Sequence, residues 1–269
     1  MLGTMLNSVI IPPQTAPISP QPPLLIVHGL YGSARNWGVI AKKLSSERKV
    51  IAVDMRNHAA SPWQSSHSYA DMAGDLAEII TAHGGRADLL GHSMGGKAAM
   101  ALALSHPGML RSLIVADIAP VVYQHSQVQI IHALRRLDLS QYETRSEANQ
   151  ALAAHIQDAP TRAFLLQSLD LKAKRWRLNL DVLEAEMPKI MGFPEFDTQY
   201  TGPTLFLSGA NSDYVQPAHR PQIKALFPKA RFASIPGAGH WLHAEKPREF
   251  EAAVRVFLQA VAKGPSEAQ

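Results

Sequence analysis

A serine flanked by glycines is the first feature of the sequence that could do chemistry: residues 91–95 read Gly-His-Ser-Met-Gly. An apolar run that suits a strand precedes this G-x-S-x-G motif, and a helix-like run of small residues follows it, which is the setting of a nucleophile elbow. Glycine is needed two positions either side of the serine, because side chains there would collide with the neighbouring strands and helix. We predict that Ser93 is a nucleophile; the alternative is an ordinary turn whose serine caps a helix.

A nucleophilic serine needs a base to take its proton, and the base needs an acid to orient it. His240 follows an apolar run and a glycine-rich turn, and the last helical stretch comes after it. It also stands last in the chain order serine, acid, histidine that accompanies the elbow motif. We therefore predict His240 as the base, with His243 as its competitor.

The elements that must position these residues alternate between strands and helices. Helical periodicity is clearest over 69–84, where the apolar residues share one face. This alternation, with short connections, predicts an α/β fold with a mostly parallel central sheet and helices on both faces. The runs that suit strands are 24–29, 49–55, 87–91, 111–120 and 203–209.

Residues 121–199 interrupt the alternation, which resumes at residue 200. We predict a core over 24–120 and 200–269, a helical cap over 121–199 that covers the site, and an N-terminal arm over the proline-rich residues 1–23. No convincing strand occurs in the cap. Its predicted helical stretches are 128–137, 146–157, 161–169 and 175–187.

These motifs resemble the α/β-hydrolases, and within them the group that contains the bacterial esterase YbfF and the animal proteins called abhydrolase domain-containing 11. The resemblance covers almost the whole chain except the arm, and the cap matches least. It implies hydrolysis of carboxylic ester or thioester bonds through an acyl-enzyme intermediate, with no cofactor and no metal. The matching stretches are HGLYGSARNWG (28–38), VDMRNHAASP (53–62), GHSMGGKAAM (91–100), DIAPVVY (117–123) and GAGHWLHAEKP (237–247).

Two aspartates compete for the role of the acid. Most α/β-hydrolases place it three residues beyond the glycine that ends the run 203–209, but that position is Ser212, and Asp213 lies one residue later. The esterases that the chain resembles carry an aspartate where Asp117 stands, within D-I-x-P. A carboxylate that ends a buried strand needs a partner, and the imidazole of His240 would be one. We favour Asp117 over Asp213 as the acid. The alternative role for Asp117 is a buried acceptor for cap backbone, and the alternative for Asp213 is a solvated loop acid.

The tetrahedral intermediate of acyl transfer needs two hydrogen-bond donors for its oxyanion. The elbow architecture supplies the backbone N–H of Met94. The resemblance implies the backbone N–H of Leu30 as the second donor. We expect His28 to be structural, and we interpret the polar residues after the run 49–55 as a structural ion-pair network: Asp54, Arg56, Asn57 and His58.

Composition narrows the classes of partner. The chain has 269 residues, no cysteine and a formal net charge of +4, with 26 basic and 22 acidic residues interspersed. Without a basic stripe we predict no nucleic-acid partner, and no apolar run approaches the roughly 18 residues of a membrane helix. We expect a small-molecule acyl ester or thioester as the partner and a cytoplasmic location; the sequence does not fix the oligomeric state.

Aromatic and apolar residues near the motifs are candidates for the substrate pocket. We predict that the cap determines the shape of the acyl pocket. Ordinary core packing explains each candidate residue equally well. Two other functions stay open: hydrolysis of a lactone or a carbon–carbon bond in a ring-fission product, and a non-catalytic binding module on the same fold. The predicted pocket residues are Tyr31, Met94, Val121, Tyr123, Trp176 and Trp241.

Overall fold

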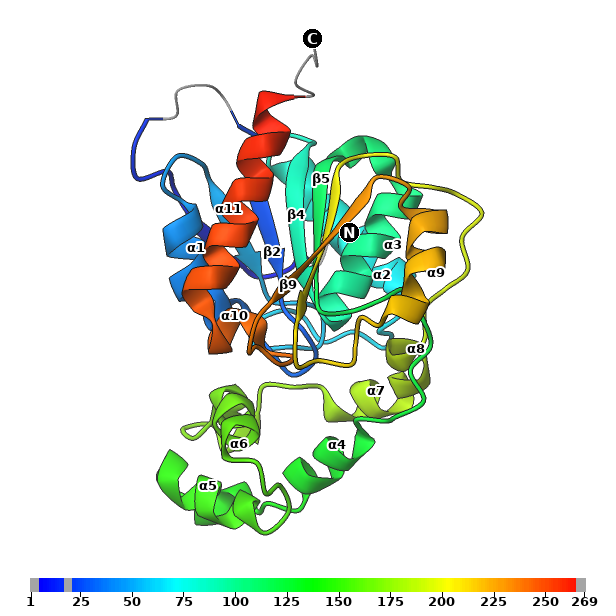
Figure 1. Cartoon of the computed structure of the whole chain (residues 1–269). Helices are drawn as coiled ribbons and strands as arrows, with labels where there is room; N and C mark the ends of the chain where they lie inside the picture. The colour runs from blue at the N-terminus through cyan, green and yellow to red at the C-terminus, as the bar shows by residue number, and fades with distance from the viewer. Residues whose placement is uncertain (1–4, 17–20, 265–269) are drawn as a thin grey trace.

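A seven-stranded sheet forms the centre of the computed structural model, which describes residues 5–16 and 21–264 (Figure 1). The edge strand β1 runs antiparallel to β3, and every other neighbouring pair is parallel. The α/β fold with a mostly parallel sheet is therefore confirmed. In spatial order the strands are β1 (Ser8–Ile11), β3 (Val50–Val53), β2 (Leu24–Val27), β4 (Ala87–His92), β5 (Leu110–Ala116), β8 (Thr204–Gly209) and β9 (Ala230–Ile235).

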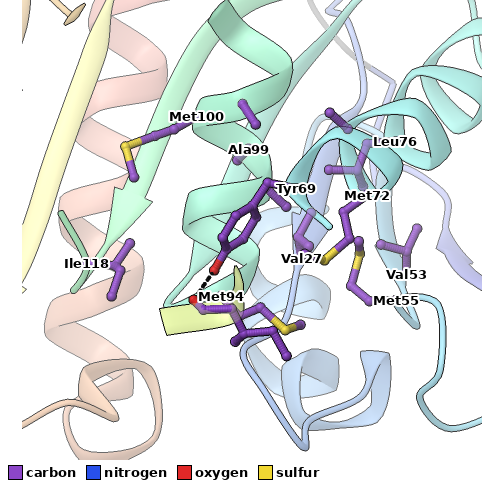
Figure 2. Close-up of a cluster of buried hydrophobic side chains, with 14 of the residues drawn as sticks. Val27, Val53, Met55, Tyr69, Met72, Leu76, Met94, Ala99, Met100 and Ile118 are labelled. Atoms are coloured by element: carbon purple, nitrogen blue, oxygen red, sulfur yellow. Dashed lines mark hydrogen bonds between the residues drawn. The ribbon is translucent and has the colours of Figure 1, made fainter. Parts of the chain in front are cut away.

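Helices cover both faces of the sheet. Strands β2, β3 and β4 are buried along their whole length, and an apolar cluster of side chains packs on each face of the sheet. Figure 2 shows part of one layer, where Met72 and Leu76 lie near Val27 and Val53 of the sheet. Helices α1 (Gly38–Leu44) and α11 (Pro247–Lys263) cover one face; α2 (Tyr69–Ala82), α3 (Met94–Ser105) and α9 (Arg220–Leu226) cover the other (Figure 1).

The predicted N-terminal arm contributes a strand to the sheet. Within it, β1 pairs with β3 in the register Ser8 to Val53 through Ile11 to Val50. Just before this strand, the side-chain amide of Asn7 donates to Asp54 Oδ2 at 2.8 Å. This part of the arm is thus tied to the core, while residues 1–4 and 17–20 lie outside the described residues.

The cap forms a separate layer at one end of the core (Figure 1). The predicted helical stretch 175–187 is wrong in its first half, because residues 175–176 pair with 169–170 as a two-stranded hairpin. Backbone contacts tie the next residues to the loop after β3: Ala59 N donates to Arg177 O at 2.7 Å, and Asn179 N donates to Asn57 O at 3.0 Å. The cap elements are α4 (Val128–Arg135), α5 (Arg145–Ala153), α6 (Ala159–Leu165), β6 (Leu169–Asp170), β7 (Arg175–Trp176), α7 (Leu180–Ala185) and α8 (Met187–Met191).

Two buried histidines join the loops under the cap. His28 Nε2 accepts from Met55 N at 2.9 Å, and His58 Nε2 accepts from Tyr31 N at 3.1 Å. Each ring also has Nδ1 within 2.9 Å of a backbone carbonyl, so each is neutral with its proton on Nδ1. Burial lowers the pKa of His28 to about 4 and, with the neighbouring His28, the pKa of His58 to about 3. Protonation of either ring would place a proton on Nε2, where it would face the backbone N–H of Met55 or Tyr31.

The lowered pKa values of His28 and His58 predict that the free energy of unfolding falls in acid. The unfolded chain takes up the protons below about pH 6.5, whereas the folded chain does not until about pH 4. Their contribution is therefore present above pH 6.5 and lost as the pH falls toward 4. Between pH 7.5 and 5.5 we expect each ring to lower the free energy of unfolding by about 1.4 kcal/mol. Urea titrations at the two pH values measure this loss. In His58→Gln it should be smaller than in the wild type by about 1.4 kcal/mol. An unchanged loss in that variant would contradict the assignment.

Candidate active site

The sharp turn between β4 and α3 carries Ser93. Its φ is 52° and its ψ is −122°, a strained conformation for a residue with a side chain. The flanking glycines permit it: a Cβ on Gly91 would lie 2.2 Å from the carbonyl oxygen of Gly95, and a Cβ on Gly95 would lie 2.4 Å from that of His28. Both obstacles are backbone atoms and cannot move aside. The crowding holds the serine at the end of the strand, next to the first turn of the helix.

Three side chains from distant parts of the chain form one hydrogen-bonded line. Ser93 Oγ lies 3.1 Å from His240 Nε2, and His240 Nδ1 lies 2.7 Å from Asp117 Oδ2. Asp117 directly follows β5 and is fully buried, whereas His240 lies in the turn between β9 and α10 (Leu242–Glu245). A base that accepts a hydroxyl proton at one nitrogen while a carboxylate holds the other is the arrangement of a serine hydrolase triad.

The loop after β8 holds the carboxylate of Asp117. Gly209 N donates to Oδ1 at 3.0 Å, and the Ser212 hydroxyl donates to Oδ2 at 2.5 Å. Ser212 is the residue that stands where most α/β-hydrolases carry their acid. Asp213, the alternative acid, is exposed, and its backbone carbonyl accepts from Gln216. The structure brings Asp117, not Asp213, to the imidazole.

Two aromatic neighbours fix the imidazole of His240, and sequence reasoning missed both. The ring of Tyr214 stacks on it with centroids 4.0 Å apart and planes 22° apart. His92 lies within 2.8 Å of the His240 carbonyl oxygen through Nε2, with the two rings 4.8 Å apart. His92 occupies the first variable position of G-x-S-x-G, so the motif itself could have indicated that His92 lies near the site. No sequence pattern indicated Tyr214.

The competing histidine has a packing role. His243 is buried and stacks on Trp37, with centroids 4.2 Å apart and planes 10° apart. Burial, together with the neighbouring His240, lowers the pKa of His243 to about 3. A base must accept a proton near neutral pH, so His243 is unsuited to that role.

Leu30 and Met94 line the cavity, and their backbone N–H groups have no protein acceptor among the described residues. Met94 begins α3, where a helix leaves its first N–H groups unpaired. The next N–H in the first loop, that of Tyr31, is taken by His58. This leaves Leu30 as the donor available beside Ser93.

A cavity of about 720 Å³ lies between the core and the cap, with Ser93 and His240 in its wall. Its size is within the range of small-molecule sites. Val121 and Trp176, both predicted for the pocket, do not line it. The Trp176 indole N–H donates to Leu134 O at 3.1 Å, which places this ring in the packing of the cap. The predicted residues that do line the cavity are Tyr31, Met94, Tyr123 and Trp241.

The polar residues after β3 make structural contacts. Arg56 binds the carboxylate of Asp75 through two nitrogens at 2.6 and 2.7 Å, and Asp54 accepts from Ala34 N at 2.7 Å. Over residues 5–16 and 21–264, no three His, Asp or Glu side chains are grouped as a metal site would need. In the same ranges, no helix is both long and apolar enough to cross a bilayer.

Comparison with known proteins gives one family. The family model described as alpha/beta hydrolase fold matches residues 22–247. The sn-1-specific diacylglycerol lipase ABHD11 of Mus musculus is 41% identical over 248 residues, which cover 88% of this chain and 81% of that protein. The esterase YbfF of Escherichia coli (strain K12) is 39% identical over 238 residues, which cover 88% of this chain and 92% of that protein.

A solved structure described as a marine microorganism esterase has a TM-score of 0.88 to this chain and 39% sequence identity. The match covers 94% of this chain and 99% of that one, so it includes the cap as well as the core. The resemblance read from the motifs is confirmed.

The crowding at the elbow predicts that one added methyl group strongly lowers the free energy of unfolding. Gly95→Ala should destabilise the protein by about 3 kcal/mol, although alanine favours helices, because its Cβ meets fixed backbone. Gly74→Ala is the matched control in α2, since nothing lies within 4 Å of its Cβ, and it should stabilise by up to about 1 kcal/mol. Thermal unfolding of both variants compares them, and similar melting temperatures would show that the elbow is not sterically limited.

Proposed function

The chain belongs to the α/β-hydrolase fold family and is an ester hydrolase, and we propose that its reaction runs through an acyl-enzyme on Ser93. The observation that carries the proposal is the line of hydrogen bonds from Ser93 Oγ through His240 to Asp117 at the wall of the cavity. In this proposal Ser93 is the nucleophile, His240 the base and Asp117 the acid.

The geometry supports an ordinary two-step acyl transfer to water. His240 Nε2 takes the proton of Ser93 as Oγ attacks the acyl carbon, and Asp117 stabilises the imidazolium that forms. The backbone N–H groups of Leu30 and Met94 bind the oxyanion, each worth about 3 kcal/mol in comparable enzymes. His240 then gives its proton to the leaving alcohol, and in the second step it activates water to release the acid.

The substrate in this proposal is a small-molecule ester with an apolar acyl group. Leu30, Met94, Ile118, Phe164 and Trp241 give the cavity a largely apolar wall. Two relatives support this substrate class, because one is named a diacylglycerol lipase and the other an esterase. Thioesters, from which a thiol would leave, are a second candidate substrate class. The predicted cytoplasmic location stays a prediction.

Removal of the nucleophile tests the reaction. Ser93→Ala should abolish hydrolysis of p-nitrophenyl esters from acetyl to palmitoyl and of acyl-CoA thioesters, with a fall in kcat of about 10⁴-fold or more, because no other group attacks the acyl carbon. The wild-type chain-length profile reports the size of the acyl pocket. Activity that survives in Ser93→Ala would refute the proposal. A folded wild type that neither cleaves these esters nor is labelled by a fluorophosphonate would favour the binding module, and labelling without cleavage would favour a lactone or ring-fission substrate.

Exchange of each aspartate for asparagine tests the acid. Asp117→Asn should lower kcat about 10³- to 10⁴-fold, because asparagine cannot hold the imidazole in the required tautomer or stabilise its charge. Asp213→Asn is the matched control on an exposed position and should stay within about twofold of wild type. Steady-state kinetics with p-nitrophenyl butyrate measure both; a larger loss in Asp213→Asn would transfer the role to that residue.

A further inference from the structure

We propose that Lys97 is a positioning residue for the cap: its ammonium group holds both connections of the cap against α3, the helix that begins next to Ser93. Through this contact it keeps one wall of the acyl pocket in place. The inference rests on the ester hydrolysis proposed above and deepens it, because it names a residue that sets which acyl groups fit.

Within the described residues, all hydrogen bonds of the ammonium group go to backbone carbonyls. Lys97 Nζ donates to Val121 O at 2.9 Å, to Met191 O at 2.9 Å and to Gly192 O at 2.6 Å. Val121 lies where the chain leaves the core for the cap, and Met191 ends α8 on the way back. One side chain therefore joins two segments that are far apart in the sequence. Its three N–H groups are matched by three acceptors.

Two tyrosines complete this contact, and we call Tyr69, Lys97 and Tyr123 the cap clamp. The Tyr69 hydroxyl donates to Ile190 O at 2.6 Å (Figure 2). Tyr123 N donates to Met191 O at 3.0 Å, and the Tyr123 ring lies 4.7 Å from Lys97 Nζ in a cation–π contact. The returning segment of the cap is thus bound by α2, by α3 and by the outgoing segment.

Packing alone does not account for a lysine here. Lys97 is 1% exposed, and no carboxylate is among its partners in the described residues. Burial lowers its pKa, because desolvation disfavours the charged form, and the three carbonyl acceptors offset part of this cost. An unbranched apolar side chain would fill the same space without the desolvation penalty. The carbonyl contacts are what an apolar residue could not supply.

The cap clamp lies on the wall of the cavity but outside the triad. Tyr69, Lys97, Tyr123 and Met191 all line the cavity. None of the hydrogen bonds among Ser93, His240 and Asp117 involves them. Loosening the clamp should therefore change how a long acyl group is held more than how the acyl carbon is attacked.

Lys97→Met tests the inference, with Lys189→Met as the matched control. Lys189 lies on α8 beside the same segment, but its exposed ammonium binds the carboxylate of Glu186 and no backbone carbonyl in the part of the chain that the structure describes. We expect Lys97→Met to raise KM for p-nitrophenyl decanoate about tenfold more than KM for p-nitrophenyl acetate, with kcat changed less. Amide hydrogen exchange over 119–123 and 187–192 should be faster than in wild type. Lys189→Met should match wild type in every measurement.

Equal losses on both esters, or no loss on either, would overturn the inference. Thermal unfolding and fluorophosphonate labelling of Ser93 show whether Lys97→Met has folded. If it has not, Tyr69→Phe makes the same comparison, because it removes only the hydroxyl that binds Ile190 O. Hydrogen exchange needs no substrate, so the clamp is still tested if the wild type cleaves neither ester and the proposed function fails.

Discussion

The close approach of backbone atoms around Ser93 is the constraint on which the rest of the structure depends. The elbow stays tight only while Gly91 and Gly95 carry no side chain, since a Cβ on either would lie within 2.4 Å of a carbonyl oxygen. That tightness puts a strained serine where strand β4 ends and helix α3 begins. Because α3 also carries Lys97, the position of the same helix affects the wall of the pocket.

A second constraint is the burial of a carboxylate at the end of β5. A fully buried Asp117 is tolerable because three donors surround it: Gly209 N, the Ser212 hydroxyl and His240 Nδ1. The end of β8 and the loop after it therefore hold the carboxylate that we propose as the acid, although the loop's own Asp213 does not take that place. The same loop places the Tyr214 ring on the imidazole of His240, so it contacts both Asp117 and His240.

Backbone groups of the cap form part of its junction with the core. Lys97 binds three carbonyls, and Asn57 and Ala59 pair with the segment after β7. Asn57 and Ala59 both adopt positive φ, 66° and 49°, which turns the loop toward the cap at some conformational cost. Contacts of this kind depend little on the identity of the cap side chains. They fix the position of the cap while leaving the lining of the pocket free to differ.

The sequence by itself determined the fold class and the elbow, because periodicity and the spacing of Gly91, Ser93 and Gly95 are local properties of the chain. It narrowed the acid to two aspartates but favoured Asp117 only through the resemblance and an argument about burial. The tertiary structure decided what depends on contacts between distant segments: that the imidazole meets Asp117, that Trp176 packs inside the cap, and that residues 175–176 form a strand. Long-range backbone pairing overrode helical periodicity there, and no local pattern records such pairing.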